Sequence, residues 1–241
     1  AISIWIGIGM LGISQIIANL IKVKHPRYVL PIFLIVPIWL FIQNINDHNH
    51  RHQYTARNFA ISMLNSCDKD AILFVDGDND TYPLWYAQYV EHIRTDVRVI
   101  NRQLLNNDYY VKQLTTQMYD NKPLKMIFSS NDYKTGVMEE VRLLPNFDTI
   151  SLVKAIRLVK DDKTSDMKFG LYVKNLNYNK FSTLVGGKPI YFDINDGAIS
   201  KSDMIILDLI ASNSDRPIYF SSYSNMDYLS LDDYLSLEGF A

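Results

Sequence analysis

The sequence predicts an α/β protein with two N-terminal membrane helices, followed by a soluble domain built on a parallel sheet and carrying a β-containing insertion. Two apolar runs without an acidic residue fill residues 1–43 and indicate the membrane part. Helical and strand patterns then alternate with short connections, an order typical of a parallel sheet. The remaining residues carry 21 basic against 26 acidic side chains, so their charge gives no reason to expect a nucleic-acid partner.

The first apolar run covers residues 1–21 and is interrupted only by serine, glutamine and asparagine. At about 1.5 Å per residue it can cross a bilayer core of roughly 30 Å. The second run, residues 28–42, is 15 residues long and contains Pro31 and Pro37. Prolines kink soluble helices but are tolerated in lipid. The alternative is a pair of buried core helices, which the lack of acidic residues disfavours.

The connection between the two runs is basic, with Lys22, Lys24 and Arg27. Short basic loops stay in the cytoplasm, so we expect everything after residue 43 to lie in the periplasm. The sequence has no initiator methionine and its basic residues follow the apolar run, so a signal peptide fits poorly. We therefore expect a piece of a longer inner-membrane protein.

Residues 44–53 form a polar linker in which His48, His50 and His52 alternate. Alternating histidines on an extended segment face one side, so a metal site is one interpretation. The other is a solvated linker at the membrane surface, which the polar composition favours. The single cysteine, Cys67, cannot form an internal disulfide.

The soluble domain, residues 54–241, begins with alternating helices and strands. They are expected over 54–66 (helix), 71–75 (strand), 81–93 (helix), 97–100 (strand) and 107–119 (helix). The continuous apolar run 71–75 is typical of a strand buried on both faces. Pro83 is tolerated because it lies in the first turn of its helix. We therefore predict a Rossmann-like parallel sheet.

Residues 121–198 are less regular, and we interpret them as the β-containing insertion. Strands are expected over 125–128, 189–192 and 198–199, a helix or a strand over 149–159, and a loop over 160–168. Ser202 is then expected to cap a helix through residue 210. The segment 215–220 is then expected to return the chain to a strand.

Three carboxylates, Asp76, Asp78 and Asp80, follow the first strand at the edge where open α/β sheets bind ligands. One interpretation is a metal-assisted phosphohydrolase with Asp76 and Asp78 around Mg²⁺, although Asp80 replaces the small residue that such sites need. A calcium loop and a glycosyltransferase Asp-x-Asp motif are alternatives. The structural alternative is that Asn79 or Asp80 caps the following helix.

The second strand ends in a similar polar segment, 106–108, which parallel topology brings beside the first loop. Together the two loops form a candidate binding rim of Asp76, Asp78, Asn79, Asp80, Tyr82, Tyr86, Asn106 and Asp108. Tyr82 and Tyr86 can stack on a sugar, whereas Trp85 and Tyr89 are expected in the core. Alternation also predicts a surface ion pair between Asp96 and Arg98.

Several motifs are specific enough to compare with known families: YTAR from Tyr54, LNSC from Leu64, GDNDTYPLWY from Gly77, IRTDVRV from Ile93, ILD from Ile206, RPIYF from Arg216 and LDDY from Leu231. They resemble a family of large multi-pass membrane proteins common in Bacteroidota. That family is similar to the vertebrate transmembrane protein O-mannosyltransferase. The match covers both ends of the soluble part, and the middle, roughly residues 130–195, is less recognisable.

The resemblance implies a polyprenyl-phosphate sugar donor and transfer to a serine or threonine of a protein acceptor. In such enzymes the catalytic acid lies in an early extracytoplasmic loop of the membrane domain, so no catalytic residue is expected within this chain. The expected partners are membrane lipid, the rest of the membrane domain and an acceptor protein, with a divalent cation as an option at the rim. Acceptor recognition or stabilisation is then the role of the soluble domain, and a non-catalytic assembly module is a further alternative.

Overall fold

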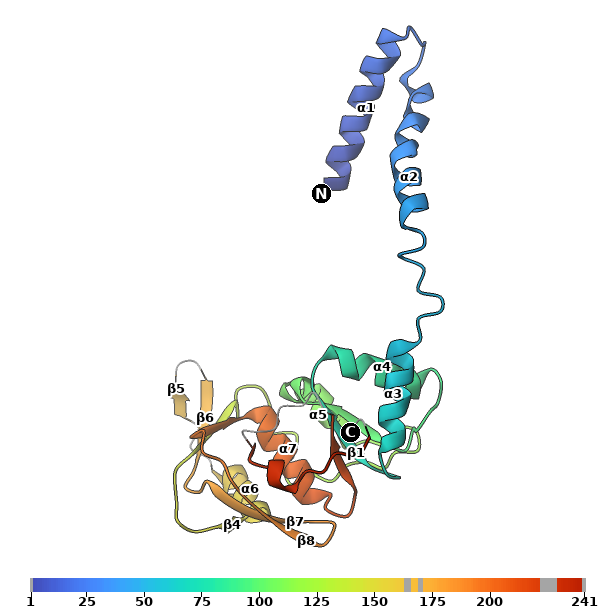
Figure 1. The fold of residues 1–241 in the computed structure, drawn as a ribbon. Helices are drawn as coiled ribbons and strands as arrows, with labels where there is room; N and C mark the ends of the chain where they lie inside the picture. Colours follow the sequence, from blue (N-terminus) through green and yellow to red (C-terminus); the bar gives the residue numbers. More distant parts are fainter. Residues whose placement is uncertain (1, 163–165, 169–170, 222–228, 240–241) are drawn as a thin grey trace. The chain divides into compact units, whose positions relative to one another are not determined.

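The computed structural model describes residues 2–162, 166–168, 171–221 and 229–239, and the chain divides into two compact units, residues 1–54 and 55–241 (Figure 1). The first unit contains α1 (Ile2–Leu20), two short 3-10 helices (Pro26–Tyr28 and Leu30–Leu34) and α2 (Ile35–Asn44). Among the described residues, one helix is long and apolar enough to cross a membrane, over Ser3–Leu20.

The second apolar run forms a 3-10 helix followed by the ten-residue helix α2. Its two prolines explain this division, because Pro31 opens the 3-10 helix and Pro37 lies in the first turn of α2. Neither position needs the N–H group that proline lacks. Most apolar side chains of this unit are exposed, including Trp5 at 73% and Trp39 at 61%.

A three-stranded sheet forms the centre of the second unit. Its strands are β1 (Ile72–Val75), β2 (Arg98–Asn101) and β10 (Ile218–Phe220), in the order β10-β1-β2. Both pairings are parallel, as predicted for β1 and β2. The carboxyl ends of the strands therefore meet at one edge of the sheet.

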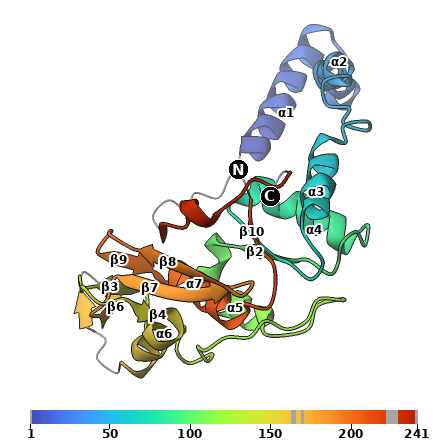
Figure 2. The same cartoon turned by 60° about the horizontal axis from the view of Figure 1, so that its bottom comes forward.

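Both faces of this sheet are buried, which explains the continuous apolar run of β1. Ile72 and Phe74 contribute to one hydrophobic core, and Leu73 and Val75 contribute to the other. Helices α3 (Thr55–Ser66) and α4 (Asp78–Tyr89) cover the second core. On the opposite side lie α5 (Asp108–Leu114) and α7 (Lys201–Ser212) (Figure 2).

The remaining strands, which lie between α5 and α7 in the sequence, form two mixed sheets. The first has the order β5-β6-β3-β9, from β5 (Asp166–Lys168), β6 (Leu171–Leu176), β3 (Glu140–Leu143) and β9 (Ala198–Ser200). The second has the order β4-β7-β8, from β4 (Ile150–Ser151), β7 (Lys180–Val185) and β8 (Lys188–Asp193). Helix α6 (Leu152–Asp161) packs against both, so the segment 149–159 is a short strand followed by a helix. Short 3-10 helices lie at Gln103–Asn106 and Asp232–Tyr234.

Several predicted boundaries were wrong. Helix α5 ends at Leu114 rather than at residue 119, because the hydroxyls of Thr115 and Thr116 donate to the carbonyls of Lys112 and Gln113. Those carbonyls would otherwise accept from the next helical turn. Likewise α4 ends at Tyr89 rather than at residue 93.

The predicted strand over 125–128 is absent. The N–H groups of Ile127 and Phe128 donate instead to the buried Asp208 carboxylate, so they are not available to a sheet. The predicted loop over 160–168 was wrong where α6 continues to Asp161 and where β5 begins at Asp166, while residues 163–165 lie outside the described part.

The expected ion pair between Asp96 and Arg98 was wrong as well. Arg94 adopts a left-handed backbone conformation, with φ of 48°, and its Nε donates to Asp96 Oδ1 at 2.9 Å. The hydrogen bonds from Arg94 lower the pKa of Asp96. Arg98 is only 3% exposed, and its Nη2 donates to the carbonyl of Gln113 at 2.8 Å.

Candidate functional site

The residue that follows each strand of the parallel sheet is polar. Asp76 follows β1, Arg102 follows β2 and Ser221 follows β10. The parallel register brings all three to the same edge. Arg102 Nη1 lies 3.1 Å from Asp76 Oδ2, and the Ser221 N–H donates to the carbonyl of Phe74 at 2.8 Å. This carboxyl edge is therefore a polar rim above an apolar sheet.

Helix α4 begins directly at this edge, with Gly77 as its N-cap residue. Gly77 has φ of 89°, a conformation that glycine adopts without the penalty of a Cβ atom. The prediction that Asn79 or Asp80 caps the helix was wrong, because the helix starts at Asp78 and includes both residues. Asp78 and Asp80 therefore lie in the first turn, where the helix dipole favours negative charge.

Asp80 connects α4 to β10. It is 4% exposed, and its Oδ2 accepts from the Ser221 hydroxyl at 2.8 Å. Burial raises the pKa of Asp80, the Ser221 hydrogen bond opposes that shift, and the nearby charge of Asp76 adds to it. The charge of the Asp76 carboxylate therefore reaches Asp80, although the two side chains have different partners.

Arg102 links the edge to helix α7. Its Nε lies 3.1 Å from Asp203 Oδ1 while its Nη1 contacts Asp76. Asp76 Oδ1 is buried and has no hydrogen-bond partner among the described residues. One guanidinium therefore holds two carboxylates that would otherwise repel each other.

The first turn of α7 carries the residues that join the second loop to this edge. Ser200 and Asp203 form a capping box, so Ser200 caps the helix and the predicted cap Ser202 was wrong. Lys201 is 1% exposed, and its Nζ donates to the carbonyl of Asn106 at 3.2 Å and to the Asp108 carboxylate.

Asp108 also accepts from the backbone N–H of Thr135 at 2.7 Å. Burial acts to raise the pKa of Asp108, but the hydrogen bonds from Lys201 and Thr135 together lower it. Sequence reasoning missed the contribution of α7 to the rim. The Ser-x-x-Asp spacing of the capping box was the available signal, although it indicates a helix start rather than a place at this edge.

The rim residues divide into two groups. Asp76, Asp80 and Asp108 are buried or half-buried in the network of Arg102, Ser221 and Lys201. The exposed members are Asp78, Asn79, Tyr82, Tyr86 and Asn106. Tyr82 is 58% exposed and Tyr86 is 47% exposed, so both rings are accessible from solvent.

The three carboxylates of the acidic cluster have different surroundings. Asp76 contacts Arg102, Asp80 contacts Ser221, and Asp78 is exposed in the first turn of α4. Within the described part of the chain, no group of three or more His, Cys, Asp or Glu side chains is placed to hold a metal ion. His48, His50 and His52 are all exposed, and His50 Nδ1 lies 2.8 Å from Gln53 Oε1.

Aromatic side chains continue from the rim along one face of α4. Tyr82 meets Trp85 edge-on with ring centroids 6.0 Å apart, and Trp85 stacks on Tyr89 at 6.1 Å. Tyr89 stacks in turn on Tyr119 at 5.6 Å. Trp85 and Tyr89, which we expected in the core, are only partly buried. We call these four residues the aromatic ladder.

A comparison with protein families gives one match. The model of the TMEM260-associated domain 2 matches residues 56–185 and 174–241, which together run from the start of α3 to the end of the chain. TMEM260 is the vertebrate O-mannosyltransferase. No solved structure matches the chain.

Proposed function

The chain belongs to the family of the TMEM260-associated domain 2, and from this membership we propose that it is the C-terminal portion of a membrane glycosyltransferase. The enzyme would take a sugar from a polyprenyl-phosphate donor and transfer it to a serine or threonine of a protein, as in O-mannosylation. The observation that carries this proposal is the family match over almost the whole second unit.

We place the first unit in the inner membrane of a bacterium of the Bacteroidota. The length and apolar composition of α1 support one span. The apolar segment Leu30–Asn44 is proposed as the second span, tilted or kinked at its prolines. The outward-facing apolar side chains of both helices would contact lipid rather than water. The basic connection between them then lies in the cytoplasm, and the second unit lies in the periplasm.

The second unit, in our proposal, recognises the acceptor protein. We regard its parallel sheet as the core of a Rossmann-like arrangement, whose ligands bind at the carboxyl edge. The exposed rings of Tyr82 and Tyr86 at that edge offer flat apolar surfaces with hydroxyl groups, which suit a peptide or a sugar. Asp76 and Asp80 are engaged with Arg102 and Ser221, so we assign them a positioning role and no catalytic one.

The test uses the full-length protein in membranes, with a polyprenyl-phosphate sugar and a serine-containing acceptor protein. Replacing Tyr82 and Tyr86 together by alanine is expected to raise the KM for the acceptor by about tenfold, the effect of losing roughly 1.4 kcal/mol of binding. The value of kcat is expected to stay within about twofold, because the rings would contribute uniform binding.

The matched control is Tyr191→Ala, which removes an equally exposed ring (60%) from β8, in a different sheet. It should leave both kinetic parameters unchanged. An equal rise of the KM for the acceptor in the double variant and in Tyr191→Ala would instead indicate general destabilisation. Failure of the parent protein to transfer sugar from any lipid-linked donor would refute the enzymatic proposal.

A further inference from the structure

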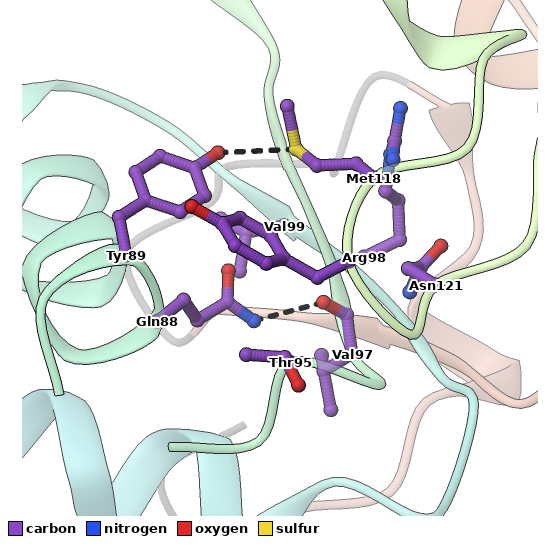
Figure 3. Close-up of a pocket in the computed structure, with 9 residues that line it drawn as sticks. Gln88, Tyr89, Thr95, Val97, Arg98, Val99, Met118 and Asn121 are labelled. Carbon is purple, nitrogen blue, oxygen red and sulfur yellow. Dashed lines mark hydrogen bonds between the residues drawn. The ribbon is translucent and has the colours of Figure 1, made fainter. Parts of the chain in front are cut away.

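A cavity of about 220 Å³ lies beside β2, on the side of the aromatic ladder. Trp85, Tyr89 and Tyr110 contribute to its walls, and Arg98 lines it as well. A second hollow of about 10 Å³ shares Arg98, Tyr89 and Met118 with it (Figure 3). The buried Arg98 side chain is therefore part of the lining of both spaces.

Arg98 is unusual among the charged groups of the second unit. It is 3% exposed, and its buried Nη1 has no hydrogen-bond partner among the described residues. None of the ion pairs in the described part of the chain includes it. Burial lowers the pKa of Arg98, Tyr110 and Tyr89 oppose that shift, and the nearby cation Arg216 adds a smaller lowering.

A buried cation without a counter-charge is costly, because water is removed and no anion replaces it. Two phenol groups lie close enough to act on Arg98, from Tyr89 and Tyr110. The Tyr110 oxygen accepts from the Asn101 N–H at 2.9 Å, and burial raises its pKa to about 12. The phenol is therefore neutral at pH 7 and keeps a proton to donate.

We propose that this cavity binds a small carboxylate attached to a planar body, with the carboxylate on Arg98 and the planar body against the aromatic side chains that line the cavity. One carboxylate neutralises one guanidinium, whereas a doubly charged phosphate would leave a buried excess charge. Two donors are available, Arg98 Nη1 and the Tyr110 hydroxyl. The two oxygens of one carboxylate can accept hydrogen bonds from both. Trp85, Tyr89 and Tyr110 line the cavity and supply apolar ring surface for the planar body.

The competing explanation is that Arg98 Nη1 donates to a trapped water. The smaller hollow has about the volume that one water molecule needs. This explanation predicts no affinity of the larger cavity for carboxylates, so ligand titration separates the two.

The reporter for such a titration is Trp85, which lines the cavity. The other two tryptophans, Trp5 and Trp39, belong to the first unit and are replaced by phenylalanine in the full 241-residue chain, held in detergent micelles. Trp85 emission is then followed during titration with benzoate, with acetate, with inorganic phosphate, and with benzyl alcohol as the uncharged ring control. Benzoate is expected to give a saturable change and to bind more tightly than the other three.

Two variants locate the binding. Arg98→Met removes the cation, and Gln113→Phe fills the cavity while leaving the backbone carbonyl that holds Arg98. Each is expected to weaken benzoate binding at least about tenfold, Arg98→Met because one charged hydrogen bond is lost and Gln113→Phe because the ring occupies the space of the ligand. Phosphate binding more tightly than benzoate, an equal benzoate response in the parent and both variants, or no saturable response would each overturn the proposal. Circular dichroism confirms that the variants are folded, and either one alone suffices for the test.

Discussion

The two ends of β2 carry arginines in opposite situations. Arg102, after the end of the strand, has a side chain that is 24% exposed and contacts the carboxylates of Asp76 and Asp203. Arg98, at its start, is 3% exposed and has no acidic partner within the described residues. The more solvated guanidinium is the one that the protein neutralises, and the more buried one is left with a donor unused.

This difference separates two uses of charge. A cation between two carboxylates stabilises the junction of β1, β2 and α7, and removing it leaves repelling anions. An unpaired buried cation lowers the stability of the folded state, and the carboxylate that we propose as ligand would supply the missing charge. The carboxyl edge is thus a structural network with an exposed aromatic surface, while the cavity at the other end of the strand has the incomplete charge balance of a binding site.

The largest expected effect comes from breaking the network. Arg102→Met should lower the free energy of unfolding by about 2 kcal/mol, between the values for an exposed ion pair and for a fully buried one. Urea unfolding followed by Trp85 fluorescence measures it, in the chain that lacks the other two tryptophans. A loss below about 0.5 kcal/mol would mean that the pairs at the carboxyl edge are as weak as ordinary surface pairs.

A smaller effect is expected at the other end of the strand. Arg98→Met removes a buried charge together with the hydrogen bond to the Gln113 carbonyl, and these two contributions oppose each other. We expect the free energy of unfolding to change by less than about 1 kcal/mol. The same urea experiment, run beside Arg102→Met, measures the contrast directly. A destabilisation equal to that of Arg102→Met would show that the hydrogen bond to the Gln113 carbonyl outweighs the cost of burying the Arg98 charge.

The smallest effect concerns pH at the carboxyl edge. Burial raises the pKa of Asp80 in the folded state. The protonated carboxyl therefore contributes to the free energy of unfolding fully below the ordinary pKa of about 3.9. This contribution is lost as the pH rises through the higher pKa of the folded state. An uncharged Asp80→Asn variant should therefore unfold at the same urea concentration as the parent at low pH and at a higher one at pH 7. The reverse order at pH 7 would show that ionised Asp80 stabilises the edge through Ser221.

The sequence was informative wherever one local pattern decided the structure. The apolar run Ala71–Val75 predicted a strand buried on both faces, and the alternation with helices predicted its parallel partner. The start of α4 was misjudged because Gly77, rather than a polar side chain, occupies the N-cap position. Residues 125–128 were misjudged because the partner of their N–H groups is Asp208, about 80 residues away along the chain.

The same limit applies to the candidate sites. The carboxylates of the first loop could be located from sequence because they follow a strand. Asp203 of α7 shares the Arg102 guanidinium with Asp76, and Ser221, just after β10, donates to Asp80. No local pattern connects these two residues with the first loop. Arg98 alternates with apolar residues in β2, and alternation alone placed it on the surface. Its burial follows from the packing of α5, whose Gln113 carbonyl accepts from it.

The pairing of β1 with β10 also bears on how the protein folds. The side chain of Arg216, just before β10, donates to the carbonyl of Asp70 across 146 positions of sequence, and Ile72 pairs with Ile218. Contacts of such high separation slow folding, because a long loop must be closed before the strand pairs. During synthesis one edge of β1 stays open until residues 218–220 have been made. The N–H and C=O groups of that edge can pair with other chains and cause aggregation, or be bound by chaperones. Truncation before residue 218 would leave the edge permanently uncovered.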